Sequence, residues 1–107
     1  MELERTINFM QSGDYKERFI AEYWQTKIRY EKLKDFCNKI ESARIQNCEL
    51  GVNVEEPKHD CPFELLREQQ RVMGEYLHIL EIRAIIEKID FNYVVVTGDL
   101  SNGKNCI

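Results

Sequence analysis

The feature that most constrains the fold is a series of mostly apolar residues spaced alternately four and three positions apart. It consists of Phe19, Tyr23, Thr26, Tyr30, Leu33, Cys37 and Ile40. This spacing is the heptad pattern of a helix that packs lengthwise against another helix. Asp14 stands three residues before Glu17, which is the Asx variant of a capping box and marks a helix start. We therefore expect a long helix that begins after residue 14.

A second long helix is expected to start at Pro62. Proline fits the first helical position, and Glu64 and Glu68 are placed favourably toward the positive N-terminus. Apolar residues then repeat at helical spacing. They are Leu65, Leu66, Val72, Met73, Tyr76, Leu77, Leu80, Ala84, Ile85, Ile86 and Ile89. Gly74 lies within this stripe and costs about 1 kcal/mol relative to alanine, which predicts close packing there.

The remaining segments carry shorter patterns. Residues 2–12 predict a short helix with Leu3, Ile7 and Met10 on one face, ended by Gly13. Residues 42–60 have no period and form a connector, in which residues 51–54 are a candidate strand. Residues 91–97, FNYVVVT, are rich in β-branched and aromatic side chains and predict a strand, followed by a polar tail to residue 107.

These patterns predict a mainly α protein with one domain over residues 1–107. Its centre is an antiparallel hairpin of two long helices over residues 14–89, with a short N-terminal helix and a short C-terminal β-strand. If Ile40 faces Leu66, the register places Leu33 beside Met73, Tyr30 beside Tyr76, and Glu22 and Tyr23 near Arg83. A single hairpin leaves Trp24, Ile28, Ile85 and Ile86 uncovered, so we expect a homo-oligomer.

Charge and composition exclude several function classes. The 15 basic and 19 acidic residues give a net charge of -4, which disfavours binding to bulk nucleic acid. The sequence has no apolar run of membrane-spanning length and no signal-like start, so we expect no membrane association and a cytosolic location. The four cysteines, Cys37, Cys48, Cys61 and Cys106, are expected to be reduced thiols there, although a secreted protein would pair them.

Catalytic and metal-binding motifs find little support. The chain has no glycine-rich phosphate loop, no G-x-S-x-G and no H-E-x-x-H pattern. His59 and Cys61, near Cys48 and Asp60, make only a weak zinc pattern, because a zinc site needs four ligands at workable spacing. His78 has no obvious nucleophile beside it. We expect a protein that is not an enzyme and needs no metal or cofactor.

The residues that need explanation are polar positions within the apolar stripe. Gln69, Tyr76 and Arg83 are seven residues apart. In one interpretation Arg83 forms a salt bridge with Glu22 and has a structural role. In the other, Arg83, Arg18 and Tyr23 line a cleft at the open end of the hairpin, where a guanidinium holds a phosphate and a ring stacks on a base.

Gln69 and Tyr76 share this ambiguity, because a hydrogen bond to a neighbouring helix would satisfy either side chain. Arg29 belongs to a locally basic part of the first long helix, which is either a solvated face or an anion-binding one. The candidate ligand-binding residues are Arg18, Tyr23, Arg29, Gln69, Tyr76 and Arg83.

The stretches DYKERFIAEYWQTKIRYEKLKDF and CPFELLREQQRVMGEYLHILEIRA resemble a family of small phage and prophage proteins related to a crAss-like phage gene product. The resemblance covers roughly residues 14–89. Its positions here are Arg18 and Glu22; Arg29, Leu33 and Phe36; and Leu65, Gln69, Met73, Tyr76, Leu80 and Arg83. It implies a phage accessory protein, and such proteins often counter host defence. The architecture is also similar to viral sponges that sequester cyclic nucleotide signals of the CBASS and Thoeris type.

Two functions follow from this resemblance. In the first, the protein is a sponge that binds a small anionic nucleotide with Arg18, Tyr23, Arg29 and Arg83 near subunit boundaries, without turnover. In the second, it inhibits a host defence complex, such as a CRISPR effector, through its acidic C-terminal half and an exposed strand edge. Arginine and tyrosine at helical spacing favour the sponge. The net charge and the FNYVVVT segment favour the inhibitor.

Overall fold

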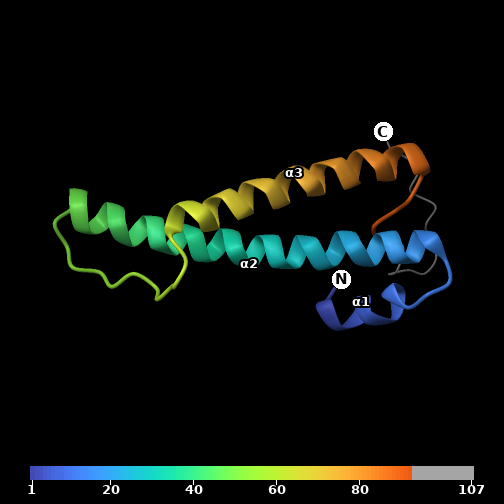
Figure 1. The fold of residues 1–107 in the computed structure, drawn as a ribbon, viewed down its shortest axis with the longest axis horizontal. Helices are drawn as coiled ribbons and strands as arrows, with labels where there is room; N and C mark the ends of the chain where they lie inside the picture. The colour runs from blue at the N-terminus through green and yellow to red at the C-terminus, as the bar shows by residue number, and fades with distance from the viewer. Residues whose placement is uncertain (93–107) are drawn as a thin grey trace.

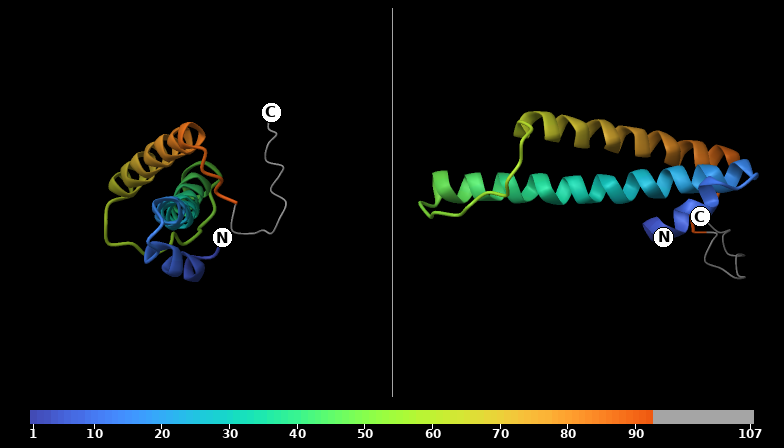
Figure 2. Two further views of the ribbon diagram at one scale, coloured as in Figure 1. Left: turned by 90° about the vertical axis from the view of Figure 1, so that its right-hand side faces the viewer. Right: turned by 60° about the horizontal axis from the view of Figure 1, so that its bottom comes forward.

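The computed structural model describes residues 1–92, which contain three helices. α1 spans Leu3–Met10, α2 spans Tyr15–Glu49 and α3 spans Phe63–Glu87. α2 and α3 run antiparallel side by side, and α1 packs on α2 on the side away from α3 (Figures 1 and 2). The prediction of a mainly helical protein is confirmed for these residues. Neither long helix within residues 1–92 has an apolar stretch that would let it cross a membrane.

The start of α2 is capped by the side chains of two residues that precede its first turn. Asp14 is the N-cap, and its carboxylate accepts a hydrogen bond from the backbone N–H of Lys16 at 3.0 Å. The N–H of Asp14 donates to the hydroxyl of Ser12, also at 3.0 Å. In a capping box the side chain of Glu17 would accept this hydrogen bond, but here Ser12 accepts it. The predicted cap residue is therefore confirmed, with a different reciprocal partner.

The predicted seam forms the core between α2 and α3. On α2 the buried seam residues are Phe19, Tyr23, Thr26, Cys37 and Ile40, and on α3 they are Leu77, Leu80 and Ala84. α2 also has the expected second contact surface, because Ile20 is buried off the seam and the indole N–H of Trp24 donates to the carbonyl of Phe91 at 2.8 Å. α1 and the residues after α3 supply that surface.

The end of α3 turns the chain back toward this core. Lys88 adopts a left-handed conformation (φ 61°, ψ 47°), and the N–H of Ile89 donates to the carbonyl of Ala84 at 2.9 Å. This is the Schellman arrangement, which satisfies a free carbonyl at the helix end. Ile89 is thereby buried, and the ring of Phe91 stacks on Tyr23 with 3.8 Å between ring centroids.

The predicted boundaries of the connector are wrong at both ends. Residues 42–49 continue α2, and the connector is the segment 50–62. No residue of 42–49 is a glycine or proline, so nothing stops the helix, and Ala43 packs into the seam. Pro62 is the N-cap of α3 rather than its first helical residue, because its ψ of 143° is extended.

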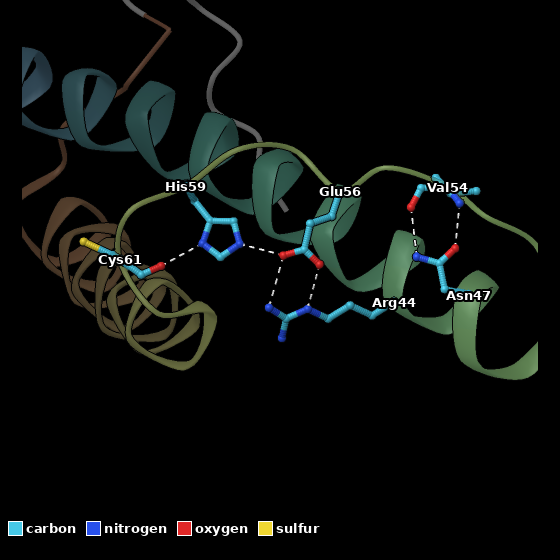
Figure 3. Close-up of polar contacts among 6 residues, drawn as sticks. All are labelled: Arg44, Asn47, Val54, Glu56, His59 and Cys61. Carbon is cyan, nitrogen blue, oxygen red and sulfur yellow. Dashed lines mark hydrogen bonds and ion pairs between the residues drawn. The ribbon is translucent and has the colours of Figure 1, made fainter.

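The strand predicted for residues 51–54 does not form. The side-chain amide of Asn47 donates to the carbonyl of Val54 at 2.8 Å and accepts from its N–H at 2.6 Å (Figure 3). Both backbone groups of Val54 are thereby engaged by a side chain, so they are not available to a neighbouring strand.

Two further segments differ from what the sequence predicted. The predicted N-terminal helix is present, but its apolar face of Leu3, Ile7 and Met10 is exposed, and Thr6 is the residue buried against α2. Phe91 and Asn92 lie in a turn. The rest of the predicted strand 91–97 and the polar tail lie outside the described residues.

Candidate ligand-binding site

The predicted register of the hairpin is wrong by about one turn at Arg83. Arg83 lies against Tyr15 and Phe19 instead of Glu22 and Tyr23. The carboxylate of Glu22 accepts a hydrogen bond from the hydroxyl of Tyr76 at 2.9 Å. Because a slip of one turn keeps the same helix faces in contact, heptad spacing identifies the contacting faces but not the turn at which they meet.

The contact in the middle of the hairpin is shifted too, by two residues along α3. Tyr30 was expected beside Tyr76, but it lies against Gly74. A Cβ atom added to this glycine would come within 3.2 Å of the Tyr30 ring. The close packing predicted at Gly74 is therefore confirmed, with Tyr30 as the residue that occupies the space.

Arg83 is the centre of a polar cluster at the open end of the hairpin. Its guanidinium lies over the ring of Phe19, 4.8 Å from the centroid, and its Nη2 donates to the Tyr15 hydroxyl at 2.6 Å. Its Nε donates to Glu87 at 3.2 Å, and Tyr15 in turn donates to Glu87 at 2.9 Å. The expected salt bridge to Glu22 is therefore wrong: the carboxylate partner is Glu87, one turn further along α3.

Arg83 remains accessible within this cluster. Its side chain is 47% exposed, and its Nη1 group has no hydrogen-bond partner in the part of the chain that the structure describes. The ring of Phe19 and the hydroxyl of Tyr15 hold the guanidinium in one orientation. The cluster thus presents a fixed, half-exposed cation beside two aromatic rings.

Three tyrosines around the hairpin keep their protons at neutral pH. The hydrogen bond to Glu87 raises the pKa of Tyr15 above its ordinary value. Desolvation, followed by the bond to Glu22, raises the pKa of Tyr76. Burial, followed by the bond to Glu81, raises the pKa of Tyr23 to about 12. All three hydroxyls therefore act as hydrogen-bond donors toward carboxylates.

The other predicted site residues are placed less favourably. Tyr23 is buried, with its hydroxyl bonded to Glu81 at 2.9 Å and its ring stacked on Phe91, so it presents no free face to a ligand. Arg18 donates to the carbonyl of Ser12 at 2.8 Å. Arg29 is exposed and has no polar partner within residues 1–92.

Gln69 makes one long contact, to the sulfur of Met73 at 3.9 Å. Of the predicted set, Tyr76 and Arg83 lie along one edge of the seam, and Gln69 continues their seven-residue spacing on α3. Arg29 stands seven residues after Glu22, the partner of Tyr76, and so lies on the same face of α2.

Sequence reasoning missed the residues that surround Arg83. Tyr15 and Phe19 are four residues apart and share a face of α2, and Glu87 follows Arg83 by four residues on α3. This i,i+4 spacing was a usable signal for the Arg83–Glu87 pair. The contact between Arg83 and Tyr15 depends on the register, which heptad spacing does not determine.

The weak zinc pattern does not become a metal site in the described residues. Within residues 1–92 no three His, Cys, Asp or Glu side chains converge. Both ring nitrogens of His59 are engaged, Nδ1 with the carbonyl of Cys61 at 2.7 Å and Nε2 with Glu56 at 2.8 Å (Figure 3). His59 therefore anchors the connector.

A family model matches residues 13–86, which include α2, the connector and nearly all of α3. The chain belongs to the Sequestin family. The Sequestin match contains Gln69, Tyr76 and Arg83, together with Tyr15 and Phe19. The family name describes the sequestration of a ligand, which is a binding role rather than a catalytic one. Searches of curated proteins and of solved structures gave no match. The link to a crAss-like phage gene product stays a prediction.

Proposed function

We propose that this Sequestin protein is a phage counter-defence protein that sequesters a small anionic nucleotide signal without turning it over. Membership of the family supports a ligand-sequestering role. We infer an anionic ligand from one observation, the half-exposed guanidinium of Arg83, which lies on the ring of Phe19 and is bonded to Tyr15.

The chemistry of Arg83 suits a phosphate group. A guanidinium presents its N–H groups in a planar fork that matches two phosphate oxygens, and charge-assisted hydrogen bonds of this kind are shorter and stronger than neutral ones. Because Phe19 and Tyr15 already orient the side chain, binding restricts it less than it would restrict a free arginine. A phosphate would compete with Glu87, which pairs with Arg83 in this structure.

Neighbouring groups extend the recognition surface along the hairpin. The hydroxyl of Tyr76, one heptad from Arg83, is a neutral donor that suits a ribose or base oxygen. Arg18 and Arg29 stand four residues before and seven residues after Glu22, so both cations lie on the same face of α2. They raise the local positive potential that attracts an anion, despite the negative net charge of the chain.

The test compares Arg83→Ala with a matched arginine on the same helix. Arg71 is also a surface arginine on α3 that pairs with glutamates of its own helix, Glu68 and Glu75. With a panel of cyclic dinucleotides and cyclic ADP-ribose compounds, we expect one compound to raise the melting temperature of the natural protein. Arg83→Ala should weaken its binding at least tenfold, whereas Arg71→Ala should leave it unchanged.

The fate of the bound compound tests the absence of turnover. After denaturation of the complex, mass spectrometry should recover the compound intact. Failure of the whole panel to bind, or recovery of a cleaved product, would contradict the proposal. Inhibition of a host defence complex, the alternative, relies on the edge of the predicted strand 91–97, outside the described residues, and stays a prediction.

A further inference from the structure

α3 carries a second apolar stripe that the hairpin leaves uncovered. It consists of Leu65, Val72, Ile79 and Ile86, each seven residues from the next, with Ile82 between the last two. Their exposures range from 45% at Ile82 to 72% at Ile86. At 100° per residue, this stripe lies on a different side of α3 from the buried Leu77, Leu80 and Ala84. α1 does not cover it, because α1 lies beyond α2 (Figure 2).

The spacing of this stripe indicates what covers it. A repeat of seven residues keeps one face turned toward a neighbouring helix that winds around it, as in coiled coils. α2 already occupies the other apolar face of α3. The second stripe therefore fits a further helix, and the chain itself offers one with a matching stripe, α3 of another copy.

We propose that a second copy of the chain covers this stripe, with the two α3 helices antiparallel and Ile79 at the two-fold axis. In this pairing each Ile79 packs on its counterpart, and Val72 of each copy packs on Ile86 of the other. The contact is isologous, as in most homodimers, because the same residues contribute from both sides.

The charges along one edge of the stripe are complementary in this arrangement. Arg83 follows Ile79 by four residues and Tyr76 precedes it by three, on the same edge of the stripe. The two-fold axis therefore brings Arg83 of one copy next to Tyr76 of the other. Tyr76 is bonded to the exposed carboxylate of Glu22, so a cation meets an anion across the interface on both sides of the axis.

The dimer also completes the proposed site. The same symmetry places both α2 helices on one side of the α3 pair, so that they form the walls of a groove with an Arg83 from each copy on its floor. A ligand with two phosphates would then meet two guanidinium groups. This consequence rests on the proposed function, whereas the dimer itself rests on the apolar stripe and the flanking charges.

Light scattering on the full chain tests the dimer. At micromolar concentration we expect twice the 12.8 kDa mass of one chain. Ile79→Asp should yield a folded monomer, because it would place two carboxylates against each other at the two-fold axis. Ile45→Asp is the matched control, since Ile45 is an apolar residue of similar exposure on α2 (46%, against 53% for Ile79).

The mass measurements can overturn the dimer. A monomeric natural protein, or an Ile79→Asp variant that remains dimeric, would overturn it. Ile86→Lys serves as a second disrupting variant if Ile79→Asp fails to fold by circular dichroism, and we expect it to yield a folded monomer as well. Persistence of the dimer in a folded Ile86→Lys variant would also overturn the proposal.

Disulfide crosslinking tests the antiparallel orientation. In a background with Cys48, Cys61 and Cys106 replaced by serine, Val72→Cys and Ile86→Cys variants are oxidised separately and after mixing. We expect crosslinked dimers mainly in the mixture, because Val72 faces Ile86 across the axis. Efficient self-crosslinking of Val72→Cys would indicate parallel helices and overturn this orientation.

The groove is tested separately from the proposed function. If the natural dimer binds a nucleotide, monomeric Ile79→Asp should bind it at least tenfold more weakly. Full affinity of that monomer would overturn the groove while leaving both the dimer and single-chain sequestration in place. A dimer that binds no nucleotide would contradict the proposed function and leave the dimer standing.

Discussion

The open end of the α2/α3 hairpin and the connector are held in place by different forces. At the open end, Phe19, Tyr23, Leu80 and Ile89 form a buried apolar cluster, with the ring of Phe91 packed against it. Cys37, Ile40 and Ala43 of α2 are buried near the other end of the hairpin, but the connector itself is held by side-chain hydrogen bonds and ion pairs, mostly in exposed positions. Burial of apolar surface contributes more to stability than exposed polar contacts do.

Because of this difference, we expect the two regions to open in different ways. The open end should unfold only with the whole molecule, whereas the connector can detach while the hairpin remains folded. The polar cluster of Arg83 lies on the open end. Its orientation is therefore supported by the most stable part of the described chain.

The largest expected effect comes from a cavity in the apolar cluster. Leu80 is 2% exposed, so Leu80→Ala should lower the free energy of unfolding by about 2–5 kcal/mol. Ile85 lies on the same helix and is 74% exposed, so Ile85→Ala should change it by less than about 0.5 kcal/mol. Urea denaturation of both variants measures the difference. Similar losses would show that the buried apolar cluster does not dominate stability.

A smaller effect is expected from the connector. Asn47→Ala removes two hydrogen bonds to Val54, which together contribute about 1–2 kcal/mol. Because this contact is local, hydrogen exchange at the Val54 amide should accelerate while exchange in the α2/α3 seam stays slow. Asn53→Ala, an exposed neighbour, is the control and should have no effect on exchange. Accelerated exchange throughout the seam would mean that the two ends are coupled.

The smallest effect is a pH dependence confined to the connector. The bonds to Glu56 and to the carbonyl of Cys61 raise the pKa of His59 above 6.5. The stability that the protonated His59 gives to the connector is therefore complete below pH 6.5 and is lost as the pH rises through the folded-state pKa. Bonds from Arg44 and then from His59 lower the pKa of Glu56 from 4.5 to about 2. The stability that the ionised Glu56 gives to the connector is complete above pH 4.5 and is lost as the pH falls toward 2.

The connector should therefore be held most tightly between about pH 4.5 and 6.5. Slower exchange at Val54 in this window, relative to the intrinsic rate, would support the assignment. In Glu56→Gln the His59 resonances should titrate at a lower pH than in the natural protein. An unchanged titration midpoint would contradict the His59–Glu56 pair.

The sequence predicted the parts of the fold that depend on periodicity. The seam from Phe19 to Ile40 and its burial follow from heptad spacing, and Asp14 was recognisable as a cap from its residue type. α2 was predicted too short, because residues 42–49 carry few apolar positions while containing nothing that ends a helix. The absent strand could not be foreseen, because the bond from Asn47 to Val54 depends on how the connector folds back.

The site was predicted only in part for a related reason. The apolar residues of α3 were assigned to one stripe, but the structure divides them between the seam and the uncovered face that contains Val72 and Ile86. Arg83 was recognisable in the sequence as a polar residue in an apolar pattern. Its neighbours Tyr15 and Phe19 were not, because they depend on the register between two helices that slide by whole turns without changing faces.

The hydrogen bond from Trp24 to Phe91 also has a spectroscopic consequence. Trp24 is the single tryptophan of the chain, and its indole lies edge-on to Tyr23 with 5.4 Å between ring centroids. Its intrinsic fluorescence therefore reports on the open end of the hairpin and is silent about the connector. Trp24 is thus a natural optical probe that lies next to its hydrogen-bond partner Phe91 in space, although the two residues are 67 positions apart in the sequence.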